Sequence, residues 1–483
     1  SCAAVRSEVY NSPAYFWKGE AGKTILIAYE ELFTVSQRLA SGEISPVELT
    51  RHVLERIEKY DPELNSFLSI NPRAEDQATR LQQLTGNSKS GPLTGIPISV
   101  KDLMTTLDMP TTAGTRVQGS WTRDRNDSEI AVRIKRAGGI LIGKTNLHEF
   151  AFGITSENEH FGPVCNPWDL ARVPGGSSGG SGAAVAAGLG FASIGTDTRG
   201  SIRIPSACCG ITGLKPTYGL VPMKGVIPLS PSLDHGGPMA RSTRDCALLL
   251  TVLCDHPGGN ENLLKAVKEP VQGLKIGLCP FYFENTDSEI QRSLREAIEL
   301  FRSEGALIRE ISISKLEAAL EASAMIAGAE ALAFHDRYIQ SVPQHYGPRV
   351  LDRFKAGYRI SGLDLARALQ VKAHIAAEFQ EIFQQVDCLL GATIPVLPPP
   401  HGTEKVRAGD IEENVVRCLV RMTAPQNMAG IPALALPCGF SAEGLPISMQ
   451  LIAAHHREDV LIRLGTHFQR LTDWHQRHPE RFN

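Results

Sequence analysis

Hydrophobic positions along the chain recur with two different periods. Apolar residues at helical spacing predict helices over 29–39, 46–57, 72–84, 130–137, 181–189, 288–303, 318–339, 363–385 and 458–471. Short apolar runs predict strands over 96–100, 139–142, 275–278, 306–311, 388–390, 433–436 and 449–452. Because strands and helices alternate, we expect an α/β fold with a mixed, mostly parallel central sheet covered by helices.

The same pattern bears on domain organisation. Residues 1–22 show neither period and predict an N-terminal tail. Residues 23–483 contain no internal repeat and no low-complexity linker, so we expect them to form a single large domain. The start of the second helix is well marked, because Ser45 can cap it and Pro46 suits its first position.

Composition changes this picture little and mainly excludes classes of partner. The chain has 483 residues, 42% of them hydrophobic, and a net charge of −3. Without a basic surplus there is no reason to expect a nucleic-acid partner. No apolar run reaches the roughly 18 residues that a membrane span needs. We expect a small-molecule substrate, and the sequence leaves a homodimer open.

The ten cysteines are irregularly spaced, and several lie in apolar runs. We interpret them as mostly buried thiols in a reducing compartment, which points to the cytoplasm. The chain starts at Ser1 without methionine, so a removed N-terminal targeting segment stays an alternative. Neither His-Glu-x-x-His nor Cys-x-x-Cys occurs, and we expect no metal and no organic cofactor.

Candidate chemistry gathers in two glycine-rich segments and one upstream lysine. Residues 175–182 combine glycines with serines, and 195–205 place Ser201 directly after Gly200. Lys101 directly follows the predicted strand over 96–100. A serine is a weak nucleophile at neutral pH and needs a base beside it. A lysine can be that base only if burial lowers its pKa from about 10.4 towards 7. These residue types indicate an acyl-transfer site.

The two segments and the lysine closely resemble the amidase signature family, most strongly over 93–245. The resemblance implies a catalytic set of Lys101 as base, Ser177 as proton relay and Ser201 as the nucleophile that forms the acyl-enzyme. It also implies a cis peptide bond between Gly176 and Ser177.

The residues around this set are expected to have supporting roles. The resemblance implies that Ser178 helps to hold Lys101. Asp197 and Arg203 are most simply interpreted as structural residues that brace the turn carrying Ser201. Glycines let backbone N–H groups point at a developing negative charge. The oxyanion is therefore expected to lie against the N–H groups of Thr198, Arg199, Gly200 and Ser201. Arg199 departs from the family pattern, which usually has glycine there.

A third segment is similar to the part of the family that lines the substrate pocket. It contains Phe150, Phe152 and Ile154, which are aromatic or aliphatic. We therefore expect an apolar or aryl acyl group rather than a charged one. Ordinary core packing of these three side chains is the alternative.

The resemblance implies a serine amidohydrolase that cleaves linear C–N amide bonds through an acyl-enzyme. A carbamate, urethane or aryl-amide hydrolase is one alternative. Another is the glutaminase-type A subunit of a tRNA-dependent amidotransferase, to which the chain is similar at 149–153. Val420 departs from that branch, which would carry an acid there to hold the amino group of glutamine.

Two further motifs match other classes by letters. Residues 138–145 fit a phosphate loop, although Ile140 and Leu141 favour a buried strand. Residues 175–179 fit a Gly-x-Ser-x-Gly nucleophile elbow with Ser177 as nucleophile. That alternative needs an acid and a histidine downstream, for which Asp234, His235, His345, His401, His455 and His456 are available.

Overall fold

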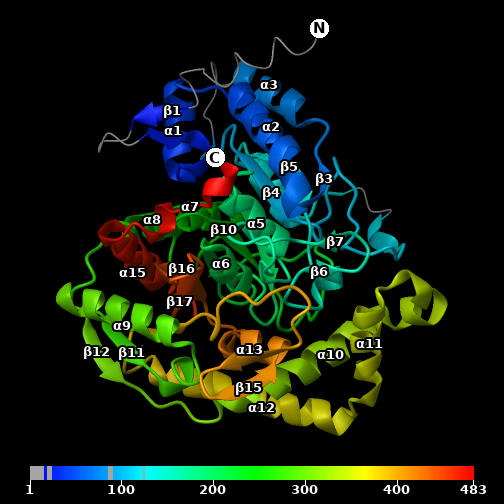
Figure 1. Ribbon diagram of the computed structural model, residues 1–483, viewed down its shortest axis with the longest axis vertical. Coiled ribbons are helices and arrows are strands. Elements are labelled where there is room, and N and C mark those ends of the chain that lie inside the picture. The colour runs from blue at the N-terminus through cyan, green and yellow to red at the C-terminus, as the bar shows by residue number, and fades with distance from the viewer. Residues whose placement is uncertain (1–15, 19–23, 85–90, 123–125) are drawn as a thin grey trace.

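The computed structural model describes residues 16–18, 24–84, 91–122 and 126–483. Most of the predicted tail, residues 1–15 and 19–22, lies outside the described residues. Within it, β1 (Phe16–Lys18) is a short strand that pairs antiparallel with β2 (Thr24–Leu26). The remaining elements build one large α/β unit around a central sheet (Figure 1).

The central sheet has eleven strands in the order β12-β11-β13-β17-β16-β9-β10-β8-β4-β5-β3. Their bounds are β3 Phe67–Ile70, β4 Pro97–Lys101, β5 Ile140–Thr145, β8 Ala192–Asp197, β9 Thr212–Lys215, β10 His235–Ala240, β11 Lys275–Leu278, β12 Leu307–Glu310, β13 Cys388–Ala392, β16 Ala433–Phe440 and β17 Pro446–Ile452. Parallel pairs join β12, β11 and β13 on one side and β8, β4 and β5 on the other. The strands between them pair antiparallel. Two small hairpins lie outside this sheet, β6 Glu157–Asn158 with β7 Gly162–Pro163 and β14 Lys405–Ala408 with β15 Ile411–Asn414.

Helices cover both faces of the sheet, as the alternating pattern predicted. The helices are α1 Leu32–Ser41, α2 Pro46–Leu64, α3 Ala74–Leu84, α4 Glu129–Arg136, α5 Gly179–Ala186, α6 Arg203–Cys209, α7 Thr243–Leu253, α8 Asn260–Ala266, α9 Ser288–Ser303, α10 Leu316–Ser341, α11 Pro348–Ala356, α12 Gly362–Ile382, α13 Val415–Arg421, α14 Ala424–Ala429 and α15 Glu458–Leu471. Contacts join α4, α7, α15 and α9 into one layer and α2, α5 and α6 into the other.

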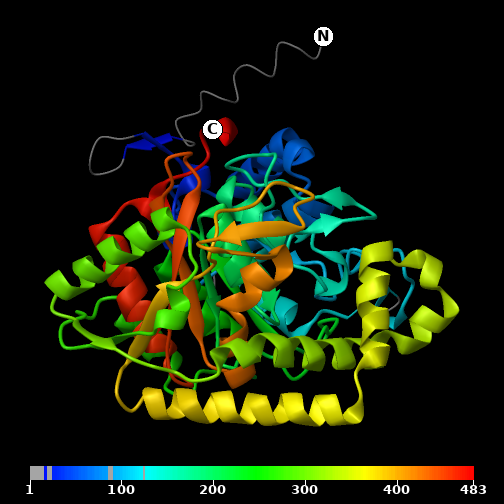
Figure 2. The same ribbon diagram turned by 60° about the horizontal axis from the view of Figure 1, so that its bottom comes forward.

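Three helices extend the unit beyond the sheet. Figure 2 shows α10 and α12 running side by side along the bottom of the molecule, with α11 projecting from their far end. Both long helices also pack against α14, which follows α13. This extension thus reaches the part of the chain just before β16.

The helix α5 explains why so many small residues occur together. Every residue of this helix is buried, and it packs against β8 and α6. A Cβ atom added at Gly180 would lie 2.4 Å from the carbonyl oxygens of Asn146 and Ser66. Only glycine permits this approach, so the Gly/Ser run is a close-packed helix start rather than a flexible linker.

Other expectations are settled by the same architecture. Residues 140–145 form the fully buried strand β5, in which Lys144 pairs with Asp102 at 2.7 Å, so the phosphate-loop alternative is wrong. Nine cysteines lie in the described residues as free thiols, eight of them buried, which confirms the expected packing for that part of the chain. None of the described helices has the length and apolar character needed to cross a bilayer.

Candidate active site

The predicted catalytic residues meet at the carboxyl ends of two neighbouring parallel strands. Lys101 is the last residue of β4, and Asp197 is the last residue of β8. These strands pair in parallel, so their ends lie at the same edge of the sheet. Ser177 lies just before α5, which packs on both strands. Open α/β sheets commonly place ligands at such an edge.

Lys101 and Ser177 are in direct contact. The Lys101 Nζ atom lies 2.7 Å from Ser177 Oγ and 2.8 Å from Thr196 Oγ1. The Gly176–Ser177 peptide bond is cis, which confirms that part of the resemblance. Burial lowers the pKa of Lys101 to about 7, against the opposing charges of Asp234 and Asp197. A substantial fraction of this lysine is therefore neutral near pH 7, as a general base must be.

The turn that carries Ser201 is organised by Asp197. This carboxylate accepts hydrogen bonds from the N–H groups of Gly200 at 2.7 Å and Ile202 at 3.2 Å. It also forms an ion pair with Arg203 at 3.1 Å, where both side chains are fully buried. Burial by itself raises the pKa of Asp197, but the charge and hydrogen bonds of Arg203, the charge of Lys215 and the Asn427 hydrogen bond together outweigh it and hold the pKa well below its usual range. Asp197 therefore stays ionised and fixes the turn.

A distant part of the chain completes this brace. The Asn427 side chain donates to Asp197 Oδ1 at 2.9 Å and accepts from Arg203 Nη2 at 2.6 Å. The Thr423 hydroxyl donates to the carbonyl of Arg199 at 2.6 Å. Gly200 has φ +130°, and an added Cβ would lie 2.3 Å from Thr423 Oγ1, so only glycine fits there. Neither Thr423 nor Asn427 was found from the sequence, because nothing in their surroundings marks them.

The Ser201 hydroxyl is available for contact with a ligand. Its side chain has no hydrogen-bond partner among the described residues, and the residue is 4% exposed. The Gly200 N–H is engaged by Asp197, whereas those of Thr198, Arg199 and Ser201 have no partner within the described part of the chain. This narrows the expected oxyanion donors to those three groups.

Two polar side chains near the predicted base have roles that the sequence did not assign. Ser178, expected to hold Lys101, instead bonds the backbone of Thr196, at 3.2 Å to its oxygen and 3.3 Å to its nitrogen. Thr196 then contacts Lys101 directly. Asp234 accepts from the Thr198 hydroxyl at 2.6 Å, and burial raises its pKa to about 6. Its place next to the turn that carries Ser201 could not be inferred from sequence spacing.

The three predicted pocket residues separate in the structure. Phe150 is 1% exposed and packs in an aromatic cluster with Trp121, Tyr346 and Phe354. We therefore correct the expectation that it lines a pocket, since its ring is enclosed by other rings. Phe152 is partly exposed at the edge of the same cluster. Ile154 belongs to a different apolar cluster, which includes Ile204 of α6.

Because Phe150 is buried among other rings, its replacement should affect the stability of the fold. We expect Phe150→Ala to lower the free energy of unfolding by about 3–5 kcal/mol, because the removed ring leaves a cavity among packed side chains. Phe152→Ala should cost less, since its ring is only partly buried. Urea unfolding of both variants measures the difference. A Phe150→Ala variant with unchanged stability and altered preference among acyl chains would restore Phe150 to the pocket.

The nucleophile-elbow alternative does not fit these contacts. Ser177 is paired with Lys101, and no histidine of the described residues hydrogen-bonds to its hydroxyl. His235 Nδ1 lies instead 2.7 Å from the carbonyl oxygen of Leu233. Asp234 contacts Thr198 rather than a histidine. The acid and histidine of an elbow-type triad are thus not assembled around Ser177.

One group in the described residues offers three metal-type donors, namely His256, His456 and Glu458. His256 Nδ1 accepts from the Gly258 N–H at 3.0 Å, so its proton lies on Nε2, 3.0 Å from Glu458 Oε2. Glu458 also accepts from the Thr217 N–H at 2.7 Å. Because both ring nitrogens of His256 are engaged in this way and Glu458 binds the Thr217 N–H, these contacts join the segment after β9 to α15.

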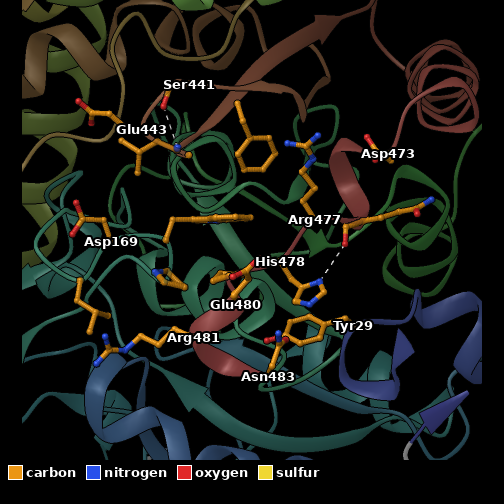
Figure 3. Close-up of a pocket in the computed structure, with 18 of the residues that line it drawn as sticks. Tyr29, Asp169, Ser441, Glu443, Asp473, Arg477, His478, Glu480, Arg481 and Asn483 are labelled. Carbon is orange, nitrogen blue, oxygen red and sulfur yellow. Dashed lines mark hydrogen bonds between the residues drawn. The ribbon is translucent and has the colours of Figure 1, made fainter. Parts of the chain in front are cut away.

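A large cavity of about 1430 Å³ lies elsewhere on the molecule. Its walls include Tyr29, Trp168, Phe440 and the C-terminal residues 476–481. Figure 3 shows the rings of Tyr29 and His478 close together at one side, where they stack at 3.9 Å. None of the predicted catalytic residues lines this cavity.

Comparison with known proteins agrees with the geometry. The family model described as Amidase matches residues 48–462. Among curated proteins, the chain is similar to the A subunit of the glutamyl-tRNA(Gln) amidotransferase of Roseiflexus sp. (strain RS-1). The two are 40% identical over 482 residues, which cover 92% of this chain and 96% of the relative.

Solved structures show the same fold. A structure described as an amidase superposes with a TM-score of 0.85 at 32% identity, covering 92% of this chain and 99% of the other. The A subunit of the glutamyl-tRNA(Gln) amidotransferase of Thermotoga maritima superposes with a TM-score of 0.75 at 30% identity, covering 91% and 94%. The chain belongs to the amidase family, whose members hydrolyse the C–N bonds of amides.

Proposed function

We propose that this chain hydrolyses a carboxamide by acyl transfer to Ser201. Neutral Lys101 accepts the proton of Ser177, Ser177 accepts that of Ser201, and Ser201 Oγ attacks the carbonyl carbon. The C–N bond breaks as the proton passes to the leaving nitrogen, and water then hydrolyses the ester. The observation that supports this order most directly is the 2.7 Å contact between Lys101 Nζ and Ser177 Oγ.

The backbone provides the electrostatic part of this proposal. The N–H groups of Thr198, Arg199 and Ser201, which have no partner among the described residues, lie in the turn that carries the nucleophile, and Asp197 holds that turn rigid. Donors fixed before the reaction stabilise a developing oxyanion without reorganising. Burial keeps water away from Lys101 and thereby keeps its pKa low.

The curated relatives favour a more specific role, as the glutamine-hydrolysing A subunit of a tRNA-dependent amidotransferase. The similarity to these A subunits extends over 92% of this chain and 96% of the Roseiflexus relative, so it is not limited to the catalytic motifs. Such a chain releases ammonia for partner subunits, and a complex with them is part of the proposal.

A stand-alone amidase is the second candidate, and Val420 favours it. This side chain is 1% exposed in an apolar cluster with Leu320 and Leu419. It therefore offers no carboxylate to the amino group of glutamine, which the resemblance would require of the amidotransferase role. The structural neighbour described as an amidase is compatible with this candidate.

Purification from the native host under mild conditions separates the two candidates. For the amidotransferase role, we expect the tagged chain to retain partner subunits and to release glutamate and ammonia from L-glutamine within the complex. A chain that purifies alone, hydrolyses simple aliphatic or aryl amides and leaves glutamine intact would contradict that role and support the stand-alone amidase.

A further inference from the structure

Arg199 lies in the turn of the nucleophile, two residues before Ser201, and has no ionic partner in the described part of the chain. Its Nε donates to Ser323 Oγ at 3.0 Å and its Nη2 to the Leu320 carbonyl at 3.1 Å, both on α10. These acceptors are neutral. Among the described residues no carboxylate oxygen lies within 4.0 Å of the guanidinium. The turn therefore carries an uncompensated positive charge.

Neighbouring arginines, unlike Arg199, form ion pairs with carboxylates. Arg203, on the same turn, pairs with Asp197 at 3.1 Å. Arg421 and Arg417 of α13 pair with Glu413 at 3.6 Å and Glu321 at 3.5 Å, respectively. A guanidinium taken out of water without a counter-charge is destabilising. Burial lowers the pKa of Arg199 to about 10, so it still carries its charge at neutral pH.

The Arg199 guanidinium also has N–H donors that can bind a ligand. Nη1 has no hydrogen-bond partner in the described part of the chain, and the side chain is partly exposed. Because Nε and Nη2 are fixed on α10, the planar group is held in one orientation. A held guanidinium with free N–H groups matches the two oxygens of a carboxylate.

Apolar side chains next to Arg199 would contact the rest of such a ligand. Leu320, whose carbonyl holds Arg199, packs in the same apolar cluster as Ile154 and Val420. This cluster also includes Ile204, one turn after the nucleophile. The charge of Arg199 thus lies between the reacting turn and an aliphatic wall, with no anion of the described chain beside it.

We propose that Arg199 binds a carboxylate carried by the amide substrate, so that the chain selects amides with a free carboxylate over neutral ones. The inference rests on the proposed function, because it places the substrate at Ser201. It replaces the expectation of an uncharged acyl group, which was based on Phe150, Phe152 and Ile154 alone. Arg199 acts here as a specificity residue, since it holds a part of the substrate that does not react.

The test compares two amides of equal length, glutaramic acid and pentanamide, which differ by the carboxylate. For the wild-type chain, in its complex if it has one, we expect kcat/KM to be about 30-fold or more higher for glutaramic acid. Arg199→Met should remove this preference, because it should raise KM for glutaramic acid far more than it changes kcat/KM for pentanamide. Arg199→Lys, which keeps the charge but not the planar group, should retain part of it.

Arg417→Met is the matched control, because it removes an arginine charge from the adjacent helix α13, and it should change neither rate. An equal loss on both amides in Arg199→Met would overturn the proposal and assign Arg199 a purely structural role. So would a wild-type chain that hydrolyses both amides equally well. Retention of the preference in Arg199→Met would overturn it as well.

A binding measurement separates this inference from the proposed function. Glutaric acid should slow the labelling of Ser201 by a fluorophosphonate in the wild type and not in Arg199→Met. If neither amide is hydrolysed but this protection occurs, the proposed hydrolysis is wrong and the carboxylate site stands. If amides are hydrolysed but glutaric acid protects neither protein, the carboxylate site is wrong and the hydrolysis stands.

Discussion

Ser201→Ala is expected to lower kcat by about 10⁴- to 10⁶-fold on any amide that the wild type hydrolyses. The reason is that the Thr198 hydroxyl of this turn donates to Asp234, whereas the Ser201 hydroxyl lies beside N–H groups that, like itself, have no partner among the described residues. The fold should be unaffected. The Ser201 hydroxyl has no hydrogen-bond partner among the described residues, so its removal leaves no donor or acceptor unsatisfied. Steady-state rates and thermal unfolding measure both effects.

A serine on the following helix provides the control for this variant. Ser206 is equally buried in α6, and its hydroxyl donates to the Ile202 carbonyl at 2.8 Å. Ser206→Ala should therefore keep activity within a few fold. Mass spectrometry after fluorophosphonate treatment should locate the adduct on Ser201. An adduct on Ser177, or near-normal activity of a folded Ser201→Ala protein, would remove Ser201 as the nucleophile.

The second large effect concerns Lys101 and pH. The neutral form is the base, so kcat/KM should rise about tenfold per pH unit below about pH 7 and level off above it. Lys101→Met should lower kcat/KM by about 10²- to 10⁴-fold and abolish this rise. The pH profile of both proteins on one neutral amide measures the effect, because such a substrate does not itself titrate in this range.

The free energy of unfolding is the control measurement for Lys101→Met. In the folded protein the pKa of Lys101 is depressed, whereas the unfolded chain binds a proton near pH 10. The free energy of unfolding of the wild type therefore falls as the pH is lowered from about 10 to about 7, and this loss is fully present at pH 6. The free energy of unfolding of Lys101→Met at pH 6 should thus be no lower than that of the wild type. An active Lys101→Met protein with an unchanged pH profile would show that Lys101 is only structural.

The sequence predicted the parts of the site that lie close together along the chain. Gly200, Ser201 and Asp197 form one turn, and a short motif can describe a turn completely. A short motif cannot predict the contact of Lys101 with Ser177, because these residues are far apart along the chain. It could be predicted because the family resemblance pairs them, and because an apolar run preceding Lys101 indicated burial.

Long-range packing accounts for what could not be predicted. Strand β8 and helix α6 are buried along their whole length, so neither shows the polar alternation that marks an amphipathic element. Asn427 reaches Asp197 only because α14 docks beside the turn. Phe150 and Ile154 lie four positions apart, yet a non-helical bend at Phe150, with φ +50°, sends them into separate clusters.

The contacts of Thr423 and Asn427 with the turn that carries Ser201 have a consequence for how the protein is made. Lys101, Ser177 and Ser201 all leave the ribosome while Thr423 and Asn427 have yet to be synthesised. Until α14 arrives, Asp197 and Arg203 lack the amide that bonds them both, and the Arg199 carbonyl lacks the Thr423 hydroxyl. A nascent chain can therefore contain its whole reactive set and still be unable to hold it in shape. We therefore expect this turn to reach its final shape only when synthesis is nearly finished.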